Sequence, residues 1–133
     1  MIDVSCAIII RGNLILVTQR SATMTLPLKW EFPGGKVEIN ETAKEALIRE
    51  IKEELDLDIE IVDELPANVH SYRMKTINLI PFICRITHGN IALKEHASFK
   101  WQRASELLRL DWAEADIPIV NCLISSLIGG IAE

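Results

Sequence analysis

The chain has 133 residues, of which 49% are hydrophobic and 25% are charged, and its net charge is −5. This length and apolar content predict one domain, residues 1–133, with a hydrophobic core of its own. Because no basic patch is present, we expect no binding to polymeric nucleic acid. The apolar tail, residues 117–131, is too short to cross a bilayer and includes Pro118, so we expect no membrane association.

The cysteines and the start of the chain bear on its compartment. Cys6, Cys84 and Cys122 are scattered in apolar surroundings. Such a set fits buried thiols in a reducing compartment better than a disulfide framework or a metal site. The apolar run at residues 4–10 lacks the basic segment that opens a signal peptide. We therefore expect a cytoplasmic protein.

The first third of the chain predicts a β-hairpin followed by a loop. The hairpin consists of an apolar run at residues 4–10, an Arg-Gly-Asn turn at residues 11–13 and a second β-rich run at residues 14–18. Arg20 follows directly, at a position that is usually plain surface. Residues 21–29 contain Pro27 and are expected to form a loop at the rim of a pocket.

A glycine pair precedes the most informative stretch. An apolar run, residues 30–33, is closed by a proline and followed by Gly34 and Gly35. Two glycines permit positive φ and a close approach of the backbone to a ligand, and phosphates held by a metal fit such a turn. Asn40 is the expected N-cap of the helix that follows.

That helix carries three glutamates on one side. With about 100° per residue, Glu50, Glu53 and Glu54 gather beside an apolar stripe formed by Leu47, Ile48, Ile51 and Leu55. Three carboxylates so close together repel one another, and a divalent cation such as Mg²⁺ or Mn²⁺ removes that conflict. The alternative is an acidic surface helix, with which the spacing of Glu45 and Arg49 agrees.

The second half of the chain alternates between strand and helix patterns. Strand patterns occur at residues 59–61, 69–72, 76–85 and 98–101, a turn at residues 88–90, and helical patterns at residues 104–108 and 117–128. Pro81 indicates a bulge or an edge position. The last helix is expected to begin at an Asp116 N-cap and to end at Gly129 and Gly130. These elements indicate an α/β sandwich with a mixed sheet.

Residues 35–57 resemble the Nudix box, G-x5-E-x7-R-E-U-x-E-E-x-G-U, in which U is aliphatic. The matching positions are Gly35, Glu41, Arg49, Glu50, Ile51, Glu53, Glu54 and Leu57. Asp56 stands where the family has glycine, at a helix end that requires positive φ. Because Asp tolerates that conformation better than most residues, the exchange bears on local stability more than on chemistry.

The resemblance implies a Nudix-type α/β/α sandwich with a mixed β-sheet and a loop-helix-loop catalytic motif. It implies cleavage of a nucleoside triphosphate to monophosphate and pyrophosphate. Mg²⁺, or Mn²⁺, would be held by Glu50, Glu53 and Glu54 with the Gly34 carbonyl. Similar enzymes often place a further glutamate, as ligand or general base, where Glu95 stands, although such a residue is commonly an exposed loop residue. Glu50 or Glu95 would accept the proton of the attacking water.

The string WEFPGGK, residues 30–36, is typical of the MutT-like group of this family. By resemblance Arg20 and Lys36 contact the phosphates, and Phe32 lines the base pocket, although the aromatic residues taken alone favour a core role. Asp116 stands where the group reads the base edge with Asn or Asp, and its carboxylate accepts from guanine-type N1–H and N2–H₂ groups or from cytosine N4–H₂.

The remaining motif residues have other expected roles. Gly34 and Gly35 lie beside the substrate by resemblance, and His96 is a candidate to orient it. Arg49, expected on the opposite side of the helix from the three glutamates, is interpreted as structural and paired with Glu41 or Glu45.

The implied substrate is a small-molecule nucleotide. The first hypothesis is 8-oxo-dGTP, in a housecleaning enzyme that clears oxidised nucleotides from the pool for DNA synthesis and repair. CTP, dCTP or a modified dCTP is the alternative, and dinucleoside polyphosphates or nucleotide sugars are further Nudix substrates. A non-catalytic nucleotide-binding module and an inert α/β domain remain as other classes. The protein is expected to be a monomer or homodimer.

Overall fold

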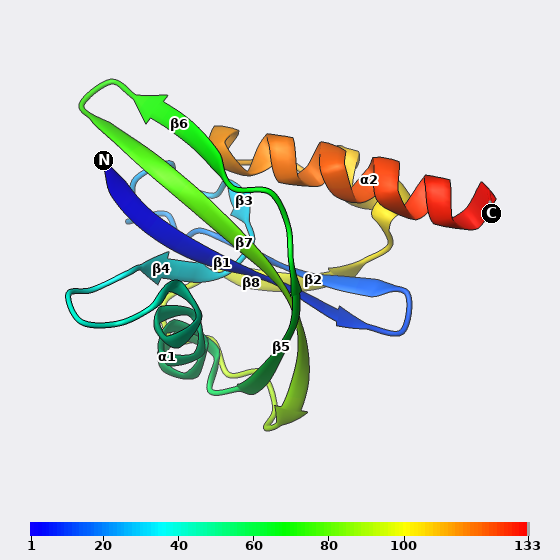
Figure 1. The fold of residues 1–133 in the computed structure, drawn as a ribbon, viewed down its shortest axis with the longest axis horizontal. Coiled ribbons are helices and arrows are strands. Elements are labelled where there is room, and N and C mark those ends of the chain that lie inside the picture. Colours follow the sequence, from blue (N-terminus) through cyan, green and yellow to red (C-terminus); the bar gives the residue numbers. More distant parts are fainter. Residues whose placement is uncertain (133) are drawn as a thin grey trace.

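The computed structural model describes the backbone of residues 1–132 and the side chains up to residue 126. A mixed β-sheet lies between two helices, α1 (Ala43–Leu55) and α2 (Ile117–Ala132), which cover opposite faces (Figure 1). The predicted α/β sandwich with a mixed sheet is therefore confirmed. No helix in the described part of the chain has the length and apolar character needed to span a bilayer.

The predicted hairpin forms the centre of the sheet. Strand β1 (Ile2–Arg11) turns at Gly12, whose φ is +63°, into the antiparallel strand β2 (Leu14–Gln19). On its other side β1 runs parallel to the long strand β7 (Lys75–His88). The parallel pair and the antiparallel hairpin together make the sheet mixed.

The other strands extend this centre. They are β3 (Trp30–Glu31), β4 (Gly34–Lys36), β5 (Asp58–Glu64), β6 (Asn68–Tyr72) and β8 (Ser98–Gln102). The main order is β3-β2-β1-β7-β5, while β4 pairs with β1, β6 with β7 and β8 with β2. Because β4 carries the glycine pair, its pairing with β1 places that pair on the sheet directly beside α1.

Alternation along β1 divides the core into two layers. Cys6 and Ile8 pack in the cluster that includes α2, whereas Ala7 and Ile9 pack in the cluster that includes α1. This is the period-two pattern of a strand buried on both faces. Of the three thiols, Cys6 and Cys84 are buried and Cys122 is half-buried, and all three are free.

Helix α1 begins and ends with specific caps. Its N-cap is Thr42 rather than the expected Asn40, because Thr42 and Glu45 form a reciprocal capping box. Asn40 instead adopts φ +69° in the preceding turn. The C-cap is Asp56 at φ +58°, so the expectation that aspartate tolerates this left-handed position is confirmed. Ile48, expected in the buried stripe, is 45% exposed.

Two further expectations were wrong. For Pro81, the edge alternative was wrong, because β7 is an inner strand; the residue instead lies at an interruption in pairing, between the segment that pairs with β6 and the segment that pairs with β5. Its missing N–H is tolerated there, and its carbonyl accepts a hydrogen bond from Leu65 N at 3.0 Å. Helix α2 continues past Gly129 and Gly130 to Ala132, since glycine weakens a helix without having to end it.

Two short 3₁₀ helices precede α2. The first, η1 (Ala104–Arg109), corresponds to the predicted helical turn, and the second, η2 (Glu114–Asp116), leads directly into α2. Together they carry the chain from β8 back across the sheet. The segment between them brings Trp112 beside Phe32, with ring centroids 4.8 Å apart.

Candidate active site

A cavity of about 530 Å³ opens beside β4 and the acidic side of α1. Its wall brings together most of the residues singled out in the sequence: Arg20, Phe32, Gly34, Gly35, Lys36, Glu50, Glu54, Glu95 and Asp116. Glu53 is not part of this wall, and its side chain is 60% exposed. The wall of the cavity therefore contains both the carboxyl groups of Glu50, Glu54 and Glu95 and the side chains of Phe32 and Asp116.

Both glycines are closely packed, Gly34 against backbone and Gly35 against the end of a side chain. A Cβ on Gly34 would lie 2.0 Å from Ser5 O on the neighbouring strand. A Cβ on Gly35 would lie 2.4 Å from Cδ of Glu50. Neither glycine has a positive φ, so their value here is the absence of a side chain rather than an unusual backbone conformation.

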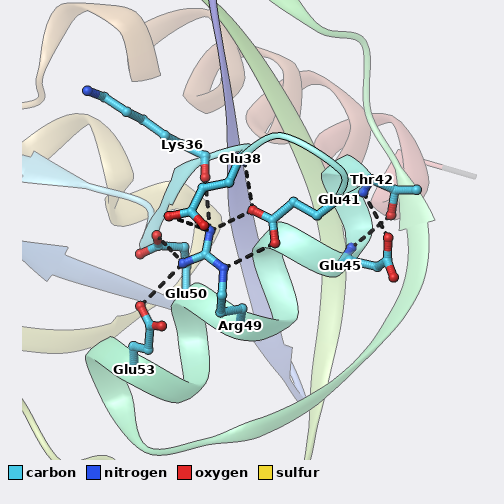
Figure 2. Close-up of polar contacts among 8 residues, drawn as sticks. All are labelled: Lys36, Glu38, Glu41, Thr42, Glu45, Arg49, Glu50 and Glu53. Atoms are coloured by element: carbon cyan, nitrogen blue, oxygen red, sulfur yellow. Dashed lines mark hydrogen bonds and ion pairs between the residues drawn. The ribbon is translucent and has the colours of Figure 1, made fainter.

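Arg49 organises the acidic helix (Figure 2). Its guanidinium donates to both carboxylate oxygens of Glu41, at 2.7 and 3.1 Å, and to the Lys36 carbonyl at 3.1 Å. The expected pairing with Glu41 is present, whereas Glu45 belongs to the capping box. These bonds tie the loop before α1 to the helix.

The expected placement of Arg49 away from the glutamates was wrong. Its Nη1 also contacts Glu50 Oε1 at 2.8 Å and Glu53 Oε2 at 3.3 Å, because the long side chain reaches round the helix (Figure 2). Hydrogen bonds to Glu41 and then Glu50 raise the pKa of Arg49. The hydrogen bond from Arg49 in turn lowers the pKa of Glu41.

Glu54 is the most perturbed carboxyl group of the site. It is 8% exposed, and its Oε1 has no hydrogen-bond partner among the residues that the structure describes. Burial, followed by repulsion from Glu50, Glu31 and Glu95, raises its pKa to about 9. A buried carboxyl group with an oxygen that lacks a partner and with other acids nearby carries a cost that a cation or a proton removes.

Sequence reasoning missed Glu31, which lies at the centre of a polar network. Its Oε1 accepts from Arg20 Nη1 at 2.8 Å, and its Oε2 lies 2.9 Å from His96 Nε2. Arg20 also donates to the Thr25 carbonyl at 2.6 Å. The one indication of its role in the sequence was its place between two aromatic residues, Trp30 and Phe32. Both of these are buried in the structure.

Asp116 directly precedes α2, as expected, and its carboxyl group lies in the cavity wall, where Oδ2 accepts a hydrogen bond from Phe32 N at 2.8 Å. Burial, with repulsion from Glu31 as the next cause, raises the pKa of Asp116 to about 8. A pKa raised in this direction favours the protonated form of the carboxyl group, which offers both an O–H donor and an acceptor.

Comparison with known proteins identifies the family. The family model of the NUDIX domain matches residues 1–121. The chain belongs to the Nudix hydrolase family. Over 94% of its length it is 34% identical to the CTP pyrophosphohydrolase of Escherichia coli K12, covering 93% of that protein. It is 33% identical, also over 94%, to a putative 8-oxo-dGTP diphosphatase 2 of Mycobacterium tuberculosis, covering 89% of it.

Solved structures agree with this Nudix assignment and with the Nudix-type fold. The solution structure of the E. coli ORF135 protein has a TM-score of 0.82 at 33% identity, covering 94% of this chain and 89% of that one. MutT of the family Nudix hydrolases from methicillin-resistant Staphylococcus aureus 252 has a TM-score of 0.76 at 46% identity, covering 94% and 96%. The predicted Nudix membership, MutT-like character and enzyme class are confirmed.

Nudix hydrolases generally use a divalent metal. Within the described residues, no three acidic, histidine or cysteine side chains already surround one point in the manner of a metal site. The donor set nevertheless fits a hard cation, because the unpartnered Glu54 oxygen lies among further carboxylates. The ligands expected from the sequence, Glu50, Glu53, Glu54 and Glu95 with the Gly34 carbonyl, stay a prediction.

Proposed function

We propose that this Nudix enzyme is a Mg²⁺-dependent pyrophosphohydrolase that cleaves nucleoside triphosphates to monophosphate and pyrophosphate. The observation that carries the proposal is the buried carboxyl group of Glu54, whose Oε1 has no hydrogen-bond partner among the described residues, in the wall of the same cavity as Phe32 and Asp116. A triphosphate would place its charged end by the acids, through the cation, and its base by Phe32. Mn²⁺ is an alternative ion.

The residues of the site would have distinct roles in the reaction. The bound cation would neutralise phosphate charge and lower the pKa of the attacking water. Arg20 and Lys36, both in the cavity wall, would stabilise the charge on the phosphates. Glu50 or Glu95 would accept the proton of that water. Arg49, held by Glu41, would keep Glu50 and Glu53 oriented.

For the base we propose an oxidised purine, with 8-oxo-dGTP as the substrate. A protonated Asp116 would accept from N1–H and donate to O6 of a guanine-type edge, while Phe32 would pack against the ring. The relatives named 8-oxo-dGTP diphosphatase support this choice. The enzyme would then clear damaged nucleotides from the cytoplasmic pool, in support of DNA repair, as a monomer or homodimer.

A cytosine nucleotide is the second candidate. A protonated carboxyl group also matches cytosine, since it accepts from N4–H₂ and donates to N3. The E. coli relative named CTP pyrophosphohydrolase supports this alternative, which includes CTP, dCTP and modified dCTP. The two candidates differ in ring size and therefore in how they fill the space beside Phe32.

A nucleotide panel with Mg²⁺ tests the proposal. Release of pyrophosphate and monophosphate would be measured with 8-oxo-dGTP, dGTP, CTP, dCTP, 5-methyl-dCTP, a diadenosine polyphosphate and ADP-ribose. The variants are Glu54→Gln and Glu53→Gln, with the exposed Glu64→Gln as the matched control. We expect one triphosphate to be preferred. Glu54→Gln and Glu53→Gln should lose most of the rate of its hydrolysis, whereas the control should keep it. Binding without turnover of any nucleotide would overturn the catalytic proposal in favour of a binding module.

A further inference from the structure

His96 is a fully buried side chain placed between two carboxylates. Its ring is 0% exposed; Nε2 lies 2.9 Å from Glu31 Oε2, and Nδ1 lies 3.6 Å from Glu54 Oε2. Neither His96 Nδ1 nor Glu54 Oε1 has a hydrogen-bond partner among the described residues. The imidazole therefore presents one nitrogen to each acid.

The contacts of His96 belong to a longer path. Glu31 uses its second oxygen for Arg20, at 2.8 Å, so one carboxylate is held between the guanidinium and the imidazole. The four side chains come from the residue after β2, from β3, from α1 and from the loop before β8. They connect Arg20, in the cavity wall, with Glu54 on helix α1.

Core packing alone does not require a histidine at this place. An apolar residue of similar volume would fill the space without burying two polar nitrogens. The pattern seen here, with an imidazole between a carboxylate at hydrogen-bond distance and a second acid, is that of a group which fixes the orientation of its neighbours. Residues that orient metal ligands in this way typically change metal affinity by roughly 10- to 100-fold when replaced.

We propose that His96 is a positioning residue that orients the Glu54 carboxylate for the cation and, through Glu31, connects it to Arg20. The inference rests on the proposed function, since it assumes that Glu54 binds the ion. Loss of the imidazole would leave Glu31 and Glu54 without the group that separates and orients them. Binding of the cation and orientation of the phosphate-contacting arginine would thus depend on the same side chain.

Binding of Mn²⁺ to the nucleotide-free protein tests the proposal without reference to turnover. Free Mn²⁺ would be followed by its electron paramagnetic resonance signal for wild type, His96→Leu, His96→Gln and the control His88→Gln, whose side chain is exposed. We expect His96→Leu to weaken binding by roughly 10- to 100-fold, as for other residues that support metal ligands. Glutamine, which keeps polar atoms near both acids, should restore part of it, and His88→Gln should bind like wild type.

Arg20→Met extends the test to the far end of the path and does not disturb the buried ring. It should weaken Mn²⁺ binding less than His96→Leu does, and the double variant should bind no more weakly than His96→Leu alone, because both changes act through Glu31. The inference would be overturned if a folded His96→Leu variant bound Mn²⁺ with wild-type affinity. If the leucine variant does not fold, wild-type affinity in Arg20→Met would overturn it instead. Turnover of nucleotides by wild type is read separately, so a failure of the proposed activity is distinguishable from a failure of the role of His96.

Discussion

Gly35 lies directly against Glu50, so that a single added carbon on the glycine would meet the carboxyl group at 2.4 Å. A Nudix-box glycine thus sets the place of a Nudix-box glutamate. The conformation of Glu50 has a further constraint in Arg49, whose Nη1 lies 2.8 Å from Oε1. The glycine on one side and the guanidinium on the other leave the carboxylate little freedom.

Gly35→Ala should therefore impair catalysis by displacing Glu50. A misplacement of about 1 Å in a catalytic group costs on the order of 100-fold in rate, and we expect a loss of at least about this size in kcat/KM. Gly12→Ala is the control: its φ of +63° strains a side chain, yet nothing lies within 4 Å of the added carbon. That variant should lose about 1–2 kcal/mol of stability with its turnover unchanged. Full activity of Gly35→Ala would contradict the role assigned to this contact.

Asp56→Gly should stabilise the protein without changing turnover. Asp56 adopts φ +58° at the end of α1, a conformation that glycine adopts at no steric cost. Because glycine also gains freedom in the unfolded chain, the net gain should be a few tenths of a kcal/mol to about 1 kcal/mol. Asp56→Ala should instead lose stability, so urea unfolding of the two variants gives opposite signs. A loss in both would indicate that the aspartate side chain itself is required.

Much of α1 could be predicted because its signals are local. The spacing of Glu50, Glu53 and Glu54 needs only the helical period, and the left-handed Asp56 follows from the position that the family gives to glycine. Even the N-cap had a local signal, since Thr42 is followed three residues later by Glu45, which distinguishes it from Asn40.

The polar network could not be predicted because its members meet only through tertiary structure. Glu31 and His96 are 65 positions apart, and their contact depends on the pairing of both β3 and β8 with β2. The turn of Asp116 towards Phe32 N, 84 positions away, likewise depends on how η2 returns to the sheet. Sequence patterns describe faces of helices and strands, whereas such contacts depend on which faces are brought together.

Asp116→Asn should change the pH dependence of stability. The pKa of Asp116 is raised to about 8 by burial and by Glu31, whereas an unfolded aspartate titrates near pH 4. Between these values the unfolded chain has released a proton that the folded chain keeps, so the free energy of unfolding falls as pH rises. The slope from this group is at most about 1.4 kcal/mol per pH unit, and its contribution is fully present below the unfolded pKa.

The asparagine variant lacks this titration. The stability of Asp116→Asn relative to wild type should therefore increase as pH rises from the unfolded to the folded pKa, as measured by urea unfolding at several pH values in that range. Asp111→Asn, at an exposed position, is the control and should follow wild type. Parallel curves for wild type and Asp116→Asn would contradict a protonated carboxyl group at this position.

Removal of the divalent ion should expose the cost of burying Glu54. Its pKa is raised to about 9 by burial and by neighbouring acids, so the metal-free protein should lose stability as pH rises from the unfolded value, about 4.3, towards that folded value. A cation at a hundredfold excess over its Kd should restore about 2.7 kcal/mol. Glu54→Gln cannot ionise, so at alkaline pH it should be more stable than metal-free wild type and respond less to Mg²⁺.

Thermal unfolding with chelator and with Mg²⁺ checks this expectation, with Glu64→Gln as the control that should respond to the ion as wild type does. Glu54→Gln should show both its greater stability without metal and its smaller stabilisation by Mg²⁺. Both effects follow from one carboxyl group, which destabilises the metal-free protein and binds the ion when it is present. Equal responses of wild type and Glu54→Gln to Mg²⁺ would show that the ion binds elsewhere. A gain in stability without loss of the Mg²⁺ response would leave Glu54 as a buried acid with no part in ion binding.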